Sequence, residues 1–548
     1  MASHTSRAAG AAIMAACLLV LAVATKTAAA ADEAVTAPTA CVASYAFAGP
    51  NHASGMATAM TRVARDLAAQ GVPVTLVHTG PVRNGAGPEE WAAKYASSGL
   101  GYVNVLATPS AAPMTGSLAK TRSYRLFEWL SANADKCNVV HVHDYRGLAY
   151  YTVTAKAAGS EALRNTAVVI QGHGNTRMMH EANGVDRLTQ EAMSDEAMEA
   201  TAVALADVLT TPTEWYATWM REAGWKLPAA TRVVPNMLPA SLTGAAAGMC
   251  EGEGANAPAR ALAFFGRQTV LKGLMTFLDA AEELCPASNP GACAYEKVMF
   301  VGPAARLASG ESSTSVIRRR CESLSVECEI VTSLSTTESA VAALAKARAV
   351  VVLPSNVETA GSALAECAVA GLPVLSSTAG GLPEMVAAGS NVFFAVGDVA
   401  ALVSKAKAAA AAPCTFLAKP AANIAAASSL WASVHRESVG LTAARAPVAE
   451  VTAAVARSVP VSVAVVGSFD SAECLASVPR CDAALAGVGE TLQSLTKQTQ
   501  AAQEILVVLP VAGTDSMAMA SVRAALATTA GARVVVVDSF ALDEHMNA

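Results

Sequence analysis

Residues 349–386 read AVVVLPSNVETAGSALAECAVAGLPVLSSTAGGLPEMV. The apolar run Ala349–Leu353 has strand length and predicts a parallel strand buried on both faces. Ser362–Ala370 predicts a short helix, with Gly371 where a terminating glycine belongs. Leu372–Ser376 then predicts a second strand. The stretch therefore indicates a strand, loop, helix and strand of an open α/β sheet.

Two carboxylates fall on the ligand side of this unit, Glu358 in the loop and Glu366 in the helix. Ligands of open α/β sheets bind outside the carboxyl ends of the strands, where helix N-termini attract anions. Two acids beside an anion site would repel phosphate, so they are expected to accept hydrogen bonds from hydroxyls. A ligand that carries both phosphates and many hydroxyls is a sugar nucleotide.

At these residues the chain resembles the retaining glycosyltransferases of family four, which have the GT-B fold. Their signature is two glutamates separated by seven residues, then G-x-P-V and G-G-x-P-E; here these are Glu358, Glu366, Gly371–Val374 and Gly380–Glu384. The family's usual Gly-Phe-Gly after the first glutamate is Thr359-Ala360-Gly361 in this chain, which puts the donor-sugar preference in question. The alternative is a Rossmann-like unit whose two acids are merely solvated.

A second element of the resemblance lies at 266–273, which reads GRQTVLKG. It follows a predicted strand, Ala261–Phe265, and precedes a predicted helix, Leu274–Leu284. An arginine fork and a lysine point charge at a helix N-terminus suit a diphosphate. In the family this element binds the donor pyrophosphate, and Arg267 and Lys272 match it.

The amino-terminal half predicts a βαβ opening. An apolar run begins at Thr39, a glycine-containing loop follows at 49–56, a helix spans about Thr58–Gln70, and a strand spans Val72–His78. Backbone N–H groups at this loop could meet a phosphate or an acceptor group. A lone glycine loop is a weak signal.

Three polar side chains, His141, His143 and Asp144, stand at the carboxyl end of another predicted strand, where a site would lie. A buried structural role is the favoured interpretation for His141 and is left open for the other two. His173 follows the predicted strand Thr166–Gln171, at the position where GT-B enzymes commonly place a histidine near the transferred sugar.

The resemblance covers about residues 40–440 and implies roles for individual residues. Glu366 would hold the donor ribose, Glu358 a donor-sugar hydroxyl, and Arg267 with Lys272 the charge of the departing diphosphate. The residues expected to contact the donor are Gly55, Gly266, Arg267, Lys272, Glu358, Gly361 and Glu366, and those expected to take part in catalysis are His173, Arg267, Lys272 and Glu358. No cofactor and no metal ion are expected, because the cations and the helix end would replace the metal.

Length and composition fit this interpretation. The chain has 548 residues, of which 53% are hydrophobic and 15% charged, so it is long enough for two or three folded domains and too apolar for a disordered chain. The net charge of −6 gives no reason to expect a nucleic-acid partner or an anionic membrane surface. The fold class expected is α/β of the GT-B type, with two Rossmann-like domains facing across a cleft. The expected parts are 1–31, a signal segment; 36–243, an acceptor domain; 258–412, a donor domain; 413–445, helices that cross back; and 458–548, a tail.

The first residues, with Arg7, an apolar run at 8–25 and small residues near 28–31, predict a secretory signal peptide. Lys26 leaves open an uncleaved signal-anchor, the only membrane association expected. Twelve cysteines are compatible with the secretory pathway, the ER or Golgi lumen or the exterior. Three pairs are close enough in sequence to close short loops, although free thiols are an equal alternative: Cys285/Cys293, Cys321/Cys328 and Cys474/Cys481.

The tail predicts strands at Val459–Val466 and Glu504–Pro510 and a helix at Glu490–Gln498. This part resembles the opening of a family-two, GT-A type glycosyltransferase. Leu509–Gly513 replaces the acids expected there and no D-x-D motif follows, so the tail is predicted to be incomplete or decayed as a catalyst.

The sequence thus favours a glycosyltransferase that uses a nucleotide-diphosphate sugar. Two alternatives remain: a non-catalytic sugar- or partner-binding protein on a GT-B scaffold, and a sugar-nucleotide epimerase. The altered loop at 359–361 motivates the binding protein, whereas the joint presence of Arg267, Lys272, Glu358 and Glu366 favours the enzyme. The donor base and sugar and the acceptor are not given by the sequence.

Overall fold

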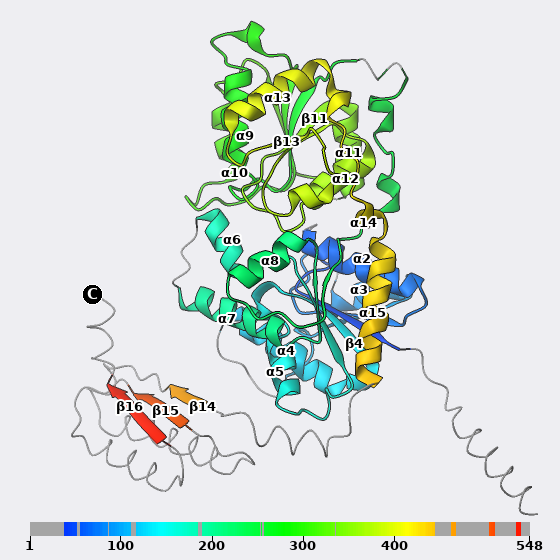
Figure 1. Cartoon of the computed structure of the whole chain (residues 1–548), viewed down its shortest axis with the longest axis vertical. Coiled ribbons are helices and arrows are strands. Elements are labelled where there is room, and N and C mark those ends of the chain that lie inside the picture. The colour runs from blue at the N-terminus through cyan, green and yellow to red at the C-terminus, as the bar shows by residue number, and fades with distance from the viewer. Residues whose placement is uncertain are drawn as a thin grey trace, which may run out of the picture. The chain divides into compact units, whose positions relative to one another are not determined.

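The computed structural model describes residues 38–443, apart from 52–54, 86, 111–116, 185–188, 253, 255–256 and 335, together with three tail strands. The chain forms two compact units, Met1–Arg445 and Ala446–Ala548. The first unit holds two parallel sheets, each with its own helices (Figure 1). The predicted signal segment at 1–31 lies outside the described residues.

The amino-terminal sheet has seven parallel strands in the order β3-β2-β1-β4-β5-β6-β7. Its strands are β1 (Ala40–Ser44), β2 (Val74–His78), β3 (Leu100–Asn104), β4 (Val139–His143), β5 (Ala167–Gln171), β6 (Val208–Thr211) and β7 (Thr231–Val233). Alternate side chains of β1 enter different cores: Ala40 and Val42 pack with α2 (Gly55–Ala69), whereas Cys41 and Ala43 pack with α4 (Leu118–Ala132) and α5 (Tyr150–Ala157). A strand buried on both faces explains the continuous apolar runs in the sequence.

Helices of this amino-terminal lobe lie on both faces of the sheet, and several side chains cap their first turns. They are α2 (Gly55–Ala69), α3 (Pro88–Ala96), α4 (Leu118–Ala132), α5 (Tyr150–Ala157), α6 (Thr176–Asn183), α7 (Gln190–Leu205) and α8 (Glu214–Glu222). At α8, for example, the Thr213 side chain accepts from the backbone N–H of Tyr216. Helix α2 begins three residues before the predicted start at Thr58.

The carboxyl-terminal lobe is built on six parallel strands in the order β10-β9-β8-β11-β12-β13. Its strands are β8 (Ala261–Phe265), β9 (Lys297–Val301), β10 (Glu327–Val331), β11 (Ala349–Leu353), β12 (Val374–Ser377) and β13 (Phe393–Phe394), and its helices are α9 (Leu274–Leu284), α10 (Ser313–Cys321), α11 (Thr337–Lys346), α12 (Ser362–Ala370), α13 (Val399–Ala411) and α14 (Ala422–Ala425). The predicted bounds of β8, α9, β11 and α12 are confirmed.

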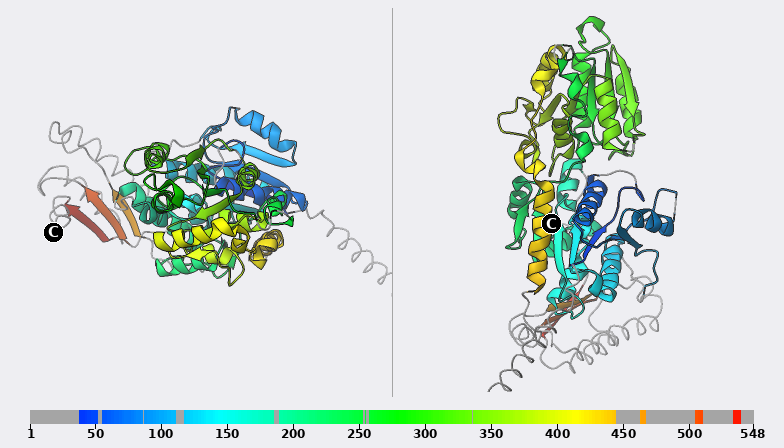
Figure 2. Two further views of the ribbon diagram at one scale, coloured as in Figure 1. Left: turned by 90° about the horizontal axis from the view of Figure 1, so that it is seen from above. Right: turned by 90° about the vertical axis from the view of Figure 1, so that its right-hand side faces the viewer.

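The last helix that the structure describes, α15 (Ala427–Ala443), crosses back to the amino-terminal lobe (Figures 1 and 2). It packs beside β4 and β5. Trp431 is fully buried there, and its indole Nε1 donates to the carbonyl of Pro235 at 3.2 Å. His435 stacks on His141, with Nδ1 and Nε2 3.3 Å apart. His141 is therefore a buried structural histidine, as favoured from the sequence.

Four disulfides join described residues. Cys285–Cys293 and Cys321–Cys328 close the short loops that sequence spacing suggested. Cys41–Cys137 and Cys250–Cys414 span 96 and 164 residues and could not be paired from the sequence. The pair Cys474/Cys481 lies outside the described residues.

The segment 244–259, which connects the two lobes, is not a free connection. Ala246 is buried, and its backbone N–H donates to the carbonyl of Ala370 at the end of α12. Together with the disulfide from Cys250, this contact fastens the connection to the carboxyl-terminal lobe.

The second unit contains a three-stranded parallel sheet, β14 (Ser462–Val466), β15 (Glu504–Leu509) and β16 (Arg533–Asp538). The first two strands match those predicted for the tail. The predicted helix at 490–498 lies outside the described residues. None of the helices in the described part of the chain is long and apolar enough to cross a membrane.

Trp431 is the largest fully buried side chain of the first unit, so its removal should weaken the docking of α15. We expect Trp431→Ala to lower the free energy of unfolding by about 3–5 kcal/mol, through lost burial and the cavity left behind. Denaturant unfolding of the full chain measures this loss. Ser429→Ala, at an exposed position of the same helix, is the control; equal stability of the two variants would contradict the docking.

Candidate functional site

The loop Gly266–Gly273 connects the end of β8 to the start of α9 and abuts the end of β11. Gly273 has φ 74°, and a Cβ there would lie 1.8 Å from the carbonyl oxygen of Pro354. Only glycine allows this approach. The predicted diphosphate loop therefore lies against the loop that carries Glu358.

Lys272 and Glu358 meet directly. The Lys272 Nζ lies 2.5 Å from Oε1 of Glu358, and the Ser355 hydroxyl donates to the same oxygen at 2.9 Å. The Arg267 side chain is exposed and has no ion-pair partner among the described residues. One of the two predicted phosphate ligands is thus neutralised by a carboxylate, while the other is free to meet an anion.

Glu366 lies in α12, which begins after Gly361 in a left-handed conformation. Its side chain is buried, and burial raises the pKa of Glu366 to about 7. The positive charge of Arg62, from α2 of the other lobe, and a 3.4 Å hydrogen bond from the Thr337 hydroxyl oppose this rise. A buried carboxylate that accepts so few hydrogen bonds has capacity for further donors.

The two lobes are joined beside these acids. The Thr213 hydroxyl donates to the carbonyl of Thr359 at 2.6 Å, and the Thr359 hydroxyl donates to the carbonyl of His173 at 3.3 Å. Glu384 of the G-G-x-P-E motif accepts from the backbone N–H groups of Glu214 and Trp215, each at 2.8 Å. A carboxylate at the first turn of α8 accepts hydrogen bonds from backbone N–H groups that have no partner within the helix. Its negative charge also interacts favourably with the positive end of the helix dipole.

His173 lies at this joint on the side of the amino-terminal lobe. Its Nε2 is buried and has no hydrogen-bond partner within the described part of the chain. Burial lowers the pKa of His173 to about 4, so the imidazole is neutral at physiological pH. The structure therefore brings His173 and the loop of Glu358 together through Thr359.

Asp144 holds the backbone around His173. Its buried carboxylate accepts from the N–H of His173 at 2.8 Å, from the N–H of Gly174 at 3.3 Å and from the hydroxyl of Tyr216 at 2.6 Å. Burial raises the pKa of Asp144, and these hydrogen bonds oppose the rise. Asp144 thus positions the loop that carries His173 by accepting hydrogen bonds from the backbone N–H groups of that loop.

Two profiles of known families match the chain. The "Glycosyl transferase 4-like domain" matches residues 54–237, and "Glycosyl transferases group 1" matches residues 251–442. Together they span well over half of the 548 residues. The chain belongs to the group 1, family-four-like glycosyltransferases. Neither match extends beyond residue 442, so the resemblance of the tail to family two stays a prediction.

Solved structures show the same fold for this glycosyltransferase. Sucrose-phosphate synthase from Thermosynechococcus elongatus has a TM-score of 0.53 at 16% identity, and the match covers 74% of this chain and 100% of that one. Anabaena HepE in complex with UDP and glucose has a TM-score of 0.50 at 15% identity, with the same coverage. The catalytic domain of starch synthase IV from Arabidopsis thaliana, bound to ADP and acarbose, has a TM-score of 0.50 at 10% identity, also with that coverage. The predicted GT-B fold is confirmed. The comparison with curated proteins returns no match.

Glu199 of the glycosyltransferase was not predicted from the sequence. Its fully buried carboxylate in α7 accepts from the N–H of Arg146 at 2.6 Å and from the N–H and hydroxyl of Thr176 at 2.9 and 2.7 Å. Burial raises the pKa of Glu199. The available signal was its place on the stripe of α7 that also buries Ala192 and Ala202.

The remaining predicted residues are less closely tied to this joint. Gly55 is the exposed first residue of α2, and a Cβ there would meet nothing within 4 Å. Gly266, at the end of β8, has φ 145°. His143 is buried at the end of β4, and its Nε2 accepts from the N–H of Tyr45 at 3.1 Å.

Across the described residues, no group of three or more His, Cys, Asp or Glu side chains could hold a metal ion.

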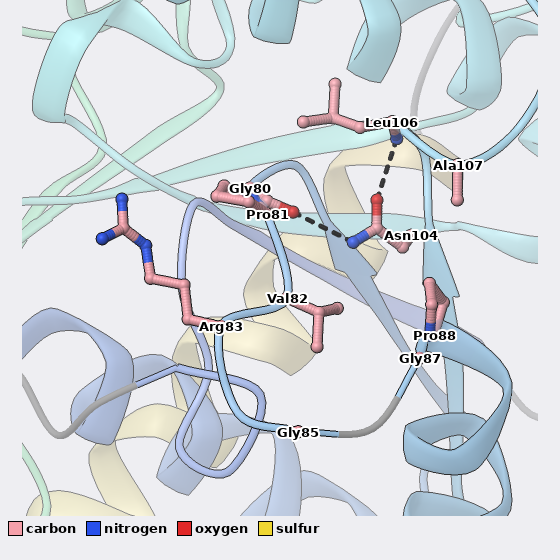
Figure 3. A pocket seen from close by; sticks show the side chains of 10 residues that line it. All are labelled: Gly80, Pro81, Val82, Arg83, Gly85, Gly87, Pro88, Asn104, Leu106 and Ala107. Carbon is pink, nitrogen blue, oxygen red and sulfur yellow. Dashed lines mark hydrogen bonds between the residues drawn. The ribbon is translucent and has the colours of Figure 1, made fainter.

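A separate hollow of about 480 Å³ lies on the glycosyltransferase's amino-terminal lobe, between the loops after β2 and β3 (Figure 3). Asn104 ties the two loops together, donating to the carbonyl of Gly80 at 2.9 Å and accepting from the N–H of Leu106 at 3.0 Å. Arg83 is at its edge, and its side chain extends away from Asn104 and Leu106 (Figure 3). None of the predicted donor residues lines this hollow.

The raised pKa of Glu366 predicts a pH dependence of stability. A carboxyl with a pKa of about 7 in the folded protein, against a reference of 4.5, contributes stability that is present below pH 4.5 and lost as the pH rises through 7. We therefore expect the stability of Glu366→Gln relative to the unmodified chain to increase by about 3 kcal/mol between pH 4 and pH 9. Denaturant unfolding at a series of pH values measures this difference.

Glu327→Gln, at an exposed position of the same lobe, corrects for the general loss of a negative charge. If the difference in free energy of unfolding between Glu366→Gln and the unmodified chain stays constant with pH, the pKa of Glu366 is not raised in the folded protein.

Proposed function

We propose that this glycosyltransferase moves a sugar from a nucleotide-diphosphate sugar to an acceptor hydroxyl, with retention of anomeric configuration and without a metal ion. The observation that carries the proposal is the ion pair between Lys272 and Glu358, which joins the Gly-Arg…Lys-Gly loop at the end of β8 to the glutamate-bearing loop at the end of β11. Anabaena HepE, which shares the fold, was solved in complex with UDP and glucose, and this supports a nucleotide-sugar donor.

The diphosphate would lie at the N-terminus of α9, against Arg267 and Lys272. The exposed guanidinium can donate two parallel hydrogen bonds to phosphate, and the helix end adds partial positive charge. Lys272 is held by Glu358 in the structure, so donor binding would shift part of its charge toward phosphate. These cations would stabilise the negative charge that develops on the leaving nucleotide diphosphate.

The two glutamates would bind hydroxyls of the donor. Glu366 is buried and, among the described residues, accepts a single long hydrogen bond, from Thr337; it would accept the ribose hydroxyls. Glu358 would hold a hydroxyl of the transferred sugar with the lone pairs that Lys272 and Ser355 leave free.

His173 would lie near the transferred sugar as a neutral imidazole, since burial lowers its pKa to about 4. We assign no side chain as the base that deprotonates the acceptor; the departing phosphate would take that proton. The two hydrogen bonds between Thr359 and the amino-terminal lobe would hold the site closed and exclude water, which limits donor hydrolysis.

The four disulfides fit an oxidising compartment, so we propose that the enzyme works in the secretory pathway, in the ER or Golgi lumen or outside the cell. The second candidate is a GT-B scaffold that binds a sugar or a partner without catalysis. The altered residue Thr359 favours it, because this side chain bonds to the other lobe instead of leaving the loop free.

The rate of sugar transfer should depend on Arg267. We expect Arg267→Ala to lower kcat by about 10²–10³, because a charge that stabilises the transition state is lost. Consumption of UDP-, ADP- and GDP-sugars by the full chain, followed by chromatography, measures the rate. Arg318→Ala, at an exposed position of α10 in the same lobe, is the matched control and should retain full activity.

If the folded protein turns over none of these sugar nucleotides, the proposed catalysis is contradicted and the non-catalytic scaffold is favoured. For an active enzyme, NMR of the fresh product settles the stereochemistry: a product anomer matching the donor supports retention, and the opposite anomer overturns it.

A further inference from the structure

The first turn of α8 is capped from both lobes at once. The side chain of Thr213, in the same lobe as α8, accepts from the N–H of Tyr216 at 3.3 Å. The carboxylate of Glu384, in the other lobe, accepts from the N–H groups of Glu214 and Trp215, each at 2.8 Å. These are the first three N–H groups of the helix, which have no partner inside it. Two of the three therefore bond to protein only while the lobes lie together.

The turn that carries Glu384 approaches α8 closely. A Cβ at Gly381 would lie 2.6 Å from the hydroxyl oxygen of Thr213 and 2.4 Å from the carbonyl oxygen of Thr359. The loop before this turn adds an apolar contact, because Val357 packs against the buried core of the amino-terminal lobe. The absence of a side chain at Gly381 thus lets the carboxylate of Glu384 reach the start of the helix.

Short hydrogen bonds connect Glu384 to the predicted transfer site. The turn that carries it donates a backbone N–H to the carbonyl of Glu358 at 2.9 Å. On the facing lobe, Thr213 immediately precedes the two capped donors and donates to the carbonyl of Thr359 at 2.6 Å. The Thr359 hydroxyl in turn donates to the carbonyl of His173 at 3.3 Å. The cap on α8 therefore holds the lobe of His173 against the lobe of Glu358.

The chemistry of Glu384 suits a contact that forms and breaks. Its side chain is half-buried, so water reaches it readily when the lobes separate. Hydrogen bonds from backbone N–H groups to a carboxylate are charge-assisted and stronger than those between neutral groups. The positive end of the helix dipole adds to the attraction. One side chain thus supplies a strong link at the surface, where the link can be released.

We propose that Glu384 is a positioning residue for sugar transfer and that its carboxylate, by capping α8 from the opposite lobe, is the latch that holds the two lobes closed. The effect on transfer rests on the proposed function, whereas the latch itself stands on the geometry. A nucleotide diphosphate would contact the carboxyl-terminal lobe, through Arg267 and Lys272, so its affinity does not depend on the latch. Transfer does, because His173 lies on the other lobe.

Hydrogen exchange at single amides of the full chain tests the latch without any substrate. We expect Glu384→Ala to accelerate exchange at the amides of Glu214 and Trp215 by about tenfold or more, because charge-assisted hydrogen bonds are lost. Glu384→Gln, which keeps an acceptor oxygen without the charge, should give an intermediate rate. The amide of Ser339, bonded at 3.1 Å to Thr336 of its own lobe, is the internal control and should not change. Unchanged exchange at both α8 amides overturns the latch.

A second variant removes one donor from the facing lobe. Glu214 is the first residue of α8, a position that accepts proline, and Thr213 before it is extended, with φ −144° and ψ 155°, as proline favours. Glu214→Pro therefore deletes one N–H of the latch within an intact helix, and its ring displaces the carboxylate. Glu214→Ala keeps that N–H. We expect faster exchange at Trp215 in the proline variant than in the alanine variant; equal exchange overturns the latch.

Kinetics separates a latch from a general loss of structure. With a sugar nucleotide that the chain consumes, we expect Glu384→Ala and Glu214→Pro to lower kcat by about tenfold or more, because the lobes are no longer held in register. The Kd of the matching nucleotide diphosphate should stay unchanged. Glu327→Ala, at an exposed position of the carboxyl-terminal lobe, is the control and should retain full kcat. An unchanged kcat in both variants, or a nucleotide Kd that weakens in parallel, overturns the positioning role.

The latch and the proposed transferase fail in different ways. If the chain consumes no sugar nucleotide, the transferase is contradicted, and exchange at Glu214 and Trp215 still decides the latch. If sugar nucleotide is consumed and exchange in Glu384→Ala is unchanged, the transferase stands and the latch is overturned.

Discussion

The hydrogen bond from the Gly381 N–H to the carbonyl of Glu358, 2.9 Å long, is the contact on which the arrangement of the site depends. It requires Gly380 at φ 56°, where a Cβ would lie 2.1 Å from the same carbonyl oxygen. With its backbone fixed in this way, Glu358 directs its carboxylate to Lys272, and the next residue, Thr359, offers its carbonyl to the other lobe. The close approach of the loops that carry Gly380 and Glu358 therefore fixes both the Lys272–Glu358 ion pair and the contact of Thr359 with the amino-terminal lobe.

Buried carboxylates perform the corresponding task in the amino-terminal lobe. Asp144 and Glu199 accept hydrogen bonds from backbone N–H groups of two segments, the turn that contains Arg146 and the connection from His173 to Thr176 at the start of α6. Burying a carboxylate is costly unless it is well hydrogen-bonded, so these loops cannot move without losing the bonds that offset the cost. The amino-terminal side of the joint is thus held by acids that contact the protein's own backbone, while the carboxyl-terminal side relies on glycines and an ion pair.

Much of the fold could be predicted from local patterns, because strands buried on both faces read as continuous apolar runs and helix ends show capping residues and glycines. This gave the bounds of β8, α9, β11 and α12. The resemblance to the family supplied a set of residues predicted to bind the donor, but it could not supply the contacts that these residues make. The Lys272–Glu358 pair joins residues 86 apart, and the disulfide Cys250–Cys414 joins residues 164 apart. Such partners depend on the strand order of the sheets, which single-sequence patterns do not contain. The role of Glu199 was missed for the same reason.

The central claim, a nucleotide-diphosphate site between the helix start at Leu274 and the two glutamates, is tested most directly by thermal unfolding with a panel of nucleotide diphosphates and sugar nucleotides. A ligand present at 100 times its Kd stabilises the folded state by about 2.7 kcal/mol, enough for a clear shift of the melting temperature. The account predicts a shift with one base, lost in both Lys272→Ala and Glu366→Ala and retained in Arg318→Ala. No shift with any member of the panel, or a shift that survives in Lys272→Ala and Glu366→Ala, would contradict it.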